Sequence, residues 1–147
     1  MVETKEKSFN RIILPVDGSE SSDKAVEKSL YLAKKTDLPI IALYIIDMNI
    51  YSKTLSSDQV SEQWKAILSN EGDSILKDIK KRAEKHNINV KTRMLEGSPS
   101  EEIMNTAGKN DLIIMGIKGK SAIDRILIGS VSENVLHHSS STVMIVR

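Results

Sequence analysis

The sequence predicts a single domain of the α/β class, built on a parallel β-sheet with helices on both faces. Short apolar runs alternate along the chain with segments whose apolar residues recur at helical spacing. Two of these runs, 40–46 and 112–115, are almost continuously apolar, which is typical of strands buried on both faces of a parallel sheet. A length of 147 residues also suits one domain, which buries ~68–70% of the surface of its unfolded chain.

Strands and helices are expected to alternate within a domain over 9–147, behind a loose, polar tail at 1–8. The expected strands cover residues 11–16, 40–46, 87–95, 112–115 and 142–146. The expected helices cover 19–35 and 56–86, followed by helices that begin near Ser98 and at Ser130, with a short helical turn at 122–127. Periodicity does not predict the order of the strands in the sheet.

Apolar faces and capping residues predict the helices. In the first helix, Ala25, Val26 and Leu30 share one side. The second helix, either straight or bent near Gly72, has an apolar stripe of Val60, Trp64, Ile67, Leu68, Ile75, Ile79 and Ala83. The last has Val131, Val135 and Leu136. Capping boxes are predicted for Ser56 with Gln59, Ser98 with Glu101, and Ser130 with Glu133, with Pro99 at a first helical position.

The strand over 87–95 is expected at an edge of the sheet because its residues alternate. Ile88, Val90, Thr92 and Met94 are predicted to face inward, against polar residues on the other side. This alternation predicts that the polar side of the strand is in contact with water.

Composition excludes several classes of function. The chain has no cysteine, and its 21 basic and 20 acidic residues give no basic surface for nucleic acid. No apolar run approaches the ~18 residues of a membrane span, and 1–8 does not resemble a signal peptide. The three histidines lie at predicted helix ends without a third type of ligand beside them, so no metal site is expected. A cytoplasmic protein is predicted.

A set of spaced glycines follows the strand at 112–115. The chain reads G-x-x-G-x9-G-S, with Gly116, Gly119, Gly129 and then Ser130 at the start of a helix. A helix N-terminus presents unpaired N–H groups that suit a phosphate, and glycine lets backbone approach a ligand closely. Each residue also has a purely local explanation as a turn or a cap. A P-loop is excluded, because Ile114 stands where its first glycine would be.

The segment 116–131, together with I-L-P-V-D-G-S-E at 13–20, resembles the ATP-binding signature of the universal stress protein family. The resemblance extends from about Phe9 to the end of the chain. It implies a Rossmann-like sheet of the adenine nucleotide alpha hydrolase type, with strand order 3-2-1-4-5. In such a sheet the site lies where the order reverses, at the carboxyl ends of the first and fourth strands.

The resemblance also implies a role for each site residue. Pro15, Val16 and Asp17 would line the adenosine half of the site, and Ile45 and Met115 would contact the base. The triphosphate would lie along Gly116, Gly119, Gly129, Ser130, Val131 and Ser132, with two serine hydroxyls among its donors and Mg or Mn as the counter-ion. Local alternatives are that Asp17 caps the first helix and that Ile45 and Met115 are core residues. Lys118, Lys120 and Arg125 could add positive charge.

The leading functional hypothesis is therefore an ATP-binding switch or binding module in the stress response, with no catalytic residues and an unknown downstream protein partner. One alternative is a slow ATP hydrolase or an adenylate-transferring enzyme. Another is a protein interaction module in which nucleotide is incidental. The resemblance also places the strand at 142–146 at a sheet edge and implies a homodimer through it, and an apolar strand at an edge favours such pairing.

Overall fold

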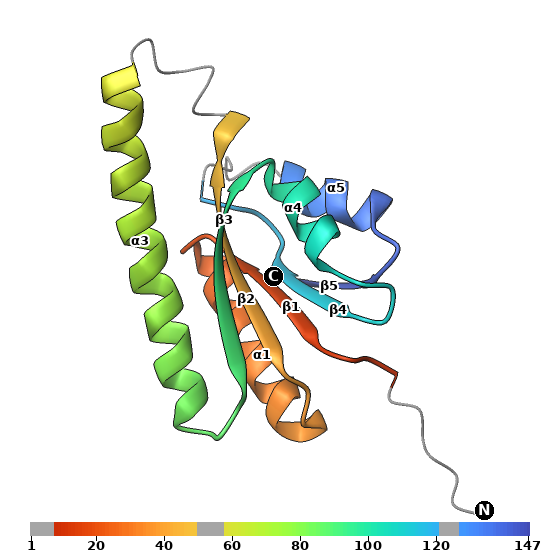
Figure 1. The fold of residues 1–147 in the computed structure, drawn as a ribbon. Helices are drawn as coiled ribbons and strands as arrows, with labels where there is room; N and C mark the ends of the chain where they lie inside the picture. The colour runs from red at the N-terminus through yellow and green to blue at the C-terminus, as the bar shows by residue number, and fades with distance from the viewer. Residues whose placement is uncertain (1–7, 50–57, 121–126) are drawn as a thin grey trace, which may run out of the picture.

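The computed structural model describes residues 8–49, 58–120 and 127–147. A five-stranded sheet runs through its centre, with every neighbouring pair of strands parallel and the order β3-β2-β1-β4-β5 (Figure 1). This confirms the α/β class and the strand order that the resemblance implies. The elements are β1 (Ile12–Val16), α1 (Glu20–Thr36), β2 (Ile40–Asp47), α3 (Asp58–Glu84), β3 (Val90–Gly97), α4 (Pro99–Thr106), β4 (Leu112–Gly116), α5 (Ser130–His138) and β5 (Thr142–Val146).

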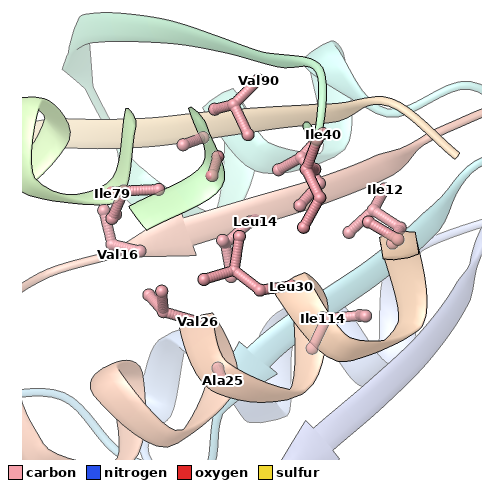
Figure 2. Packing of buried hydrophobic residues seen from close by; sticks show 14 of the residues in the cluster. Ile12, Leu14, Val16, Ala25, Val26, Leu30, Ile40, Ile79, Val90 and Ile114 are labelled. Carbon is pink, nitrogen blue, oxygen red and sulfur yellow. The ribbon is translucent and has the colours of Figure 1, made fainter. Parts of the chain in front are cut away.

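Helices cover both faces of the sheet and enclose a separate apolar core on each. On the face covered by α1 and α3, Figure 2 shows Leu14 of β1 close to Val26 and Leu30 of α1. On the opposite face, Ile13 belongs to a second cluster that includes Ile103 of α4 and Val135 of α5. The alternation of Ile13 and Leu14 between these clusters is the period of two expected of a strand buried on both sides.

The ends of α1 follow from its sequence. Ser19 is the N-cap, and its hydroxyl accepts a hydrogen bond from the Ser22 N–H at 3.2 Å. Asp37 ends the helix in the left-handed region, with φ of 60°, and donates its N–H to the carbonyl of Ala33. Both boundaries lie within one residue of the predicted ones.

Two predicted capping boxes are wrong in detail. Ser98 is the N-cap of α4 and Pro99 follows it in the first turn, as predicted, but the Ser98 side chain makes no capping hydrogen bond. The N-cap of α5 is Gly129 rather than Ser130. Gly129 donates its N–H to the Ile117 carbonyl at 2.7 Å, which holds Gly129 extended and leaves Ser130 as the first helical residue. The predictions for Ser56 and for the turn at 122–127 lie outside the described residues.

β3 begins three residues later than predicted. Asn87 adopts a left-handed φ of 55°, and the Ile88 N–H donates to the carbonyl of Ala83, so a turn after α3 occupies the predicted start of the strand. The edge position is confirmed, but Thr92 is exposed rather than facing inward.

The apolar stripe of α3 is buried over only part of its length. The helix is continuous through Gly72, so the straight alternative is the correct one. Leu76, Ile79 and Ala83 are buried against the sheet. Near the N-terminus, three residues that were predicted to be packed are exposed: Val60 by 47%, Trp64 by 44% and Ile67 by 56%. In Figure 1 this yellow end of α3 extends past the carboxyl ends of the strands. Leu136 of α5 is also exposed rather than buried.

Candidate functional site

A cavity of about 490 Å³ lies at the carboxyl ends of β1, β2 and β4. All eleven residues that the sequence predicted for the site line this cavity: Pro15, Val16, Asp17, Ile45, Met115, Gly116, Gly119, Gly129, Ser130, Val131 and Ser132. The cavity therefore forms where the strand order reverses, as expected for an open parallel sheet.

Asp17 connects the loop after β1 to the loop after β4. Its Oδ1 accepts a hydrogen bond from the Ser19 N–H at 2.9 Å, and its Oδ2 accepts one from the Lys120 N–H at 3.0 Å. The predicted local role is thus present as a turn, although Ser19 and not Asp17 is the N-cap of α1. Two backbone donors fix this carboxylate in the wall of the cavity, and its oxygens can accept further hydrogen bonds.

The three spaced glycines lie close to other atoms of the protein. A Cβ on Gly116 would lie 2.5 Å from Ser21 Oγ and 2.7 Å from the Ser22 nitrogen at the start of α1. A Cβ on Gly119 would lie 2.6 Å from Asp17 Oδ2, and one on Gly129 would lie 3.0 Å from the Cα of Lys118. The sequence argument assigned the missing Cβ atoms to the approach of an anion. Within the chain as described, neighbouring protein atoms also approach these positions, so the glycines let the two loops pack closely, and their role toward an anion stays a prediction.

The N-terminus of α5 opens into the cavity through residues 130–132. The first N–H groups of an α-helix have no intrahelical acceptor, so this end can donate to an anion. Ser130 is exposed, whereas Ser132 is buried and donates its hydroxyl to the Gly116 carbonyl at 2.7 Å. Ser132 thus ties α5 to the end of β4, and donation of both serine hydroxyls to a phosphate stays a prediction.

The other end of the cavity is apolar. Met115, Ile103 and Pro99 line it, together with the half-buried Ile45. Met115 and Ile45 also pack in the core cluster under α4 and α5, so the core explanation and the lining explanation both hold. An apolar slot of this kind suits a flat ring system.

The lining residues on the α3 side were not predicted, and they include Tyr44, Trp64, Leu68 and Glu71. The Tyr44 hydroxyl donates to Glu71 Oε2 at 3.4 Å, and Glu71 Oε1 forms an ion pair with Lys120. Burial first, and then the negative charge of Glu71, raise the pKa of Tyr44 to about 12. The available signal was the spacing of 64, 68 and 71, which puts one face of α3 toward the cavity and interrupts an apolar stripe with a carboxylate.

Of the predicted loop cations, Lys118 and Lys120 line the cavity, and Arg125 lies outside the described residues. Among the residues that the structure describes, no group of three or more histidine and acidic side chains could hold a metal ion. None of the described helices is long and apolar enough to cross a membrane.

Similar proteins share this fold over nearly the whole chain. Universal stress protein MJ0531 of Methanocaldococcus jannaschii is 35% identical, and the match covers 100% of this chain and 87% of that protein. The solved structure of the hypothetical protein MJ0577 matches with a TM-score of 0.82 at 30% identity. The match covers 95% of this chain and 96% of the MJ0577 chain.

Two solved structures of universal stress proteins contain a nucleotide. One is a complex with cAMP, at 24% identity and a TM-score of 0.68, with 96% of this chain and 98% of that chain covered. The other, from Archaeoglobus fulgidus, is a complex with dAMP, at 15% identity and a TM-score of 0.63, with 96% and 100% covered. For this chain both show the fold alone. The sequence profile of the Universal stress protein family matches residues 8–147. The chain therefore belongs to the universal stress protein family.

Proposed function

We propose that this chain binds an adenine nucleotide, ATP with Mg or Mn, in the cavity at the mouth of α5. In this proposal it acts as a nucleotide-dependent switch or binding module and not as an enzyme with rapid turnover. The observation that carries the proposal is that eleven residues predicted from a nucleotide-binding motif line one open cavity. The cAMP and dAMP complexes of other family members support an adenine nucleotide as the ligand class.

The two ends of the cavity differ chemically, as the two ends of a nucleotide do. The apolar end, with Ile45 and Met115, suits adenine, and the N-terminus of α5 suits phosphate. Asp17 lies between the two loops that border these ends and provides acceptors for ribose hydroxyl groups. A triphosphate at the α5 end would meet N–H groups that carry the partial positive charge of the helix.

A divalent ion fits this site only as a partner of the phosphates. The described residues hold no cluster of three acidic or histidine side chains that could bind a metal by themselves. Mg²⁺ commonly keeps several waters and binds through one or two carboxylates and the substrate phosphates. When bound, it would neutralise phosphate charge, and Asp17 is the lining carboxylate that the motif places nearest the glycine loop.

Isothermal titration calorimetry with ATP and Mg tests the proposal directly. The single tryptophan, Trp64, lines the cavity, so its fluorescence on excitation near 295 nm provides a second signal on the same sample. Saturable binding by both signals is expected. Folded protein that shows no binding at millimolar ATP would contradict the proposal.

Gly119→Ala provides the matched test of the site. Its new Cβ would fall 2.6 Å from Asp17 Oδ2 and displace either the loop or the carboxylate, so we expect ATP binding at least about tenfold weaker, about 1.4 kcal/mol. Gly108→Ala is the control, because that Cβ would lie 3.4 Å from its nearest neighbour and Gly108 does not line the cavity. Equal ATP affinity in the two variants would argue against a ligand at the glycine loop.

Turnover is measured separately by phosphate release. The binding-module proposal expects ATP to be retained, with release well below the ~1 s⁻¹ that marks the low end of ordinary enzymes. Sustained release at or above that rate would favour the hydrolase alternative.

We also propose a homodimer through β5. The strand lies at a sheet edge, with half-buried Val143 and Ile145 and with Met144 exposed by 37%. An unpaired apolar edge of this kind favours pairing with a second copy. Light scattering at ~10 µM, where a specific interface should persist, is expected to give twice the chain mass. A monomer at that concentration would contradict it, and Met144→Lys should shift a dimer toward monomer.

A further inference from the structure

We propose that Glu71 of α3 is a specificity-determining residue, which sets how strongly the cavity discriminates between nucleotides with different numbers of phosphates. It does so by holding the side chain of Lys120 along the cavity wall until an anion competes for that lysine. This inference rests on the proposed nucleotide site and assigns a role to residues outside the glycine motif.

The ion pair between Lys120 and Glu71 connects the glycine loop to α3. Lys120 follows Gly119 in the loop after β4, and its backbone N–H is fixed by Asp17 Oδ2 at 3.0 Å. From there its side chain passes Gly18, where a Cβ would lie 3.5 Å from Lys120 Nζ, and reaches Glu71 Oε1. Both Lys120 and Glu71 line the cavity, so the pair lies along its wall.

Glu71 is the more firmly held member of the pair. Its Oε2 accepts the hydrogen bond from Tyr44, and Tyr44 is only 5% exposed. The next residue, Gly72, packs directly against the Tyr44 ring, which fixes α3 on β2 at this point. The side chain of Glu71 is 32% exposed, whereas that of Lys120 is 54% exposed. The ammonium group of Lys120 is carried on four flexible methylene groups. Lys120 is therefore the partner that can move.

A polyphosphate at the mouth of α5 changes the balance of charges on this wall. It is repelled by the fixed carboxylate of Glu71 and attracts the ammonium group of Lys120 away from it. Both effects grow with the charge of the ligand, so they act most on ATP, less on AMP and not on adenosine. Because the pair is partly exposed, the expected effects on affinity are modest, of about twofold to fivefold, and they decrease with salt.

The test compares the binding of ATP, ADP, AMP and adenosine to the wild-type chain and to Glu71→Gln. Glutamine keeps an acceptor for Tyr44 and removes the charge. We expect Glu71→Gln to bind ATP about fivefold more tightly and AMP about twofold more tightly, with adenosine unchanged and the differences reduced at about 0.5 M salt. Lys120→Met should weaken ATP binding and leave adenosine unchanged.

Asp78→Asn is the matched control. It removes the same charge from an ion-paired carboxylate of α3, seven residues further along the helix and thus about 10 Å from position 71. We expect it to change the ATP affinity much less than Glu71→Gln does. Circular dichroism on each variant confirms that the fold is intact.

The outcomes separate the two proposals. If Glu71→Gln shifts all four ligands by one factor, or none of them, the role of Glu71 is overturned while nucleotide binding stands. If neither wild type nor Glu71→Gln binds ATP, both proposals fall. If only Glu71→Gln binds ATP, the role of Glu71 is supported and binding by the native chain is overturned.

Discussion

The two halves of α3 have the same apolar periodicity and different surroundings. In the second half, Leu76, Ile79 and Ala83 are buried against the sheet. In the first half, Trp64 and Ile67 are about half exposed, and the residues that do face inward line the cavity. The difference arises because the inward-facing residues of the first half border the open cavity at the carboxyl ends of the strands, whereas those of the second half pack on buried residues of the sheet. Periodicity predicts which face of a helix is apolar, and only the neighbouring elements decide whether that face becomes core or cavity wall.

Among the substitutions in α3, Ile79→Ala should reduce the stability most. Ile79 is 1% exposed in the core under α1 and α3, so its truncation leaves a cavity and should cost about 2–5 kcal/mol of unfolding free energy. Ile67→Ala, at 56% exposure on the same helix, should change the stability by less than about 0.5 kcal/mol. Urea unfolding followed by circular dichroism measures both. Equal losses would show that the first half of α3 is packed as tightly as the second.

Gly72→Ala tests the boundary between the halves. A Cβ there would lie 2.4 Å from the Tyr44 ring and 2.7 Å from Met94, so α3 or the ring must shift. We expect this overpacking to lower the free energy of unfolding by about 1–3 kcal/mol. Alanine is the better helix former by about 1 kcal/mol, which offsets only part of that loss. An increase in the urea midpoint would mean that the helix does not press on β2 at this point.

High pH provides a smaller effect at the same boundary. The pKa of Tyr44 rises from its ordinary 10.0 to about 12, chiefly through burial. The unfolded chain therefore loses its proton first, and the contribution of Tyr44 to stability is complete below about pH 10 and is lost as the pH rises through about 12. The urea midpoint of the wild type should fall more steeply over this range than that of Tyr44→Phe. Parallel slopes would contradict the raised pKa.

Much of the fold could be predicted from the pattern of residues. Alternating apolar runs and amphipathic segments predict a parallel α/β sheet, and the ends of α1 follow from Ser19 and Asp37. The order of the strands came from the family resemblance, because every buried strand presents the same apolar run. The predicted start of β3 was wrong because Asn87 and Ile88 form a turn with the end of α3. The alternation of apolar and polar residues does not distinguish such a turn from a strand.

The site was predictable where it is continuous in sequence. The glycine motif and the segment at the end of β1 were predicted from the sequence, and their residues line one cavity. The wall contributed by α3 was missed because Trp64 and Leu68 fit an ordinary core stripe. Glu71 was missed because its two partners, Tyr44 and Lys120, are 27 and 49 positions away along the chain. Such pairings depend on the packing of α3 across the sheet.

The glycine motif has a consequence for comparing members of this family. At Gly116 a methyl group would strike the backbone at the start of α1, so the packing of the two loops itself requires this glycine, whereas the nearest atoms to a Cβ at Gly119 and Gly129 are the Asp17 carboxylate and the Lys118 Cα at 3.0 Å. A relative that binds no ligand would therefore still need Gly116. A glycine at this position in a relative is therefore evidence of how the loops pack. Evidence for a nucleotide has to come from the N-terminus of α5 and from direct measurements of binding.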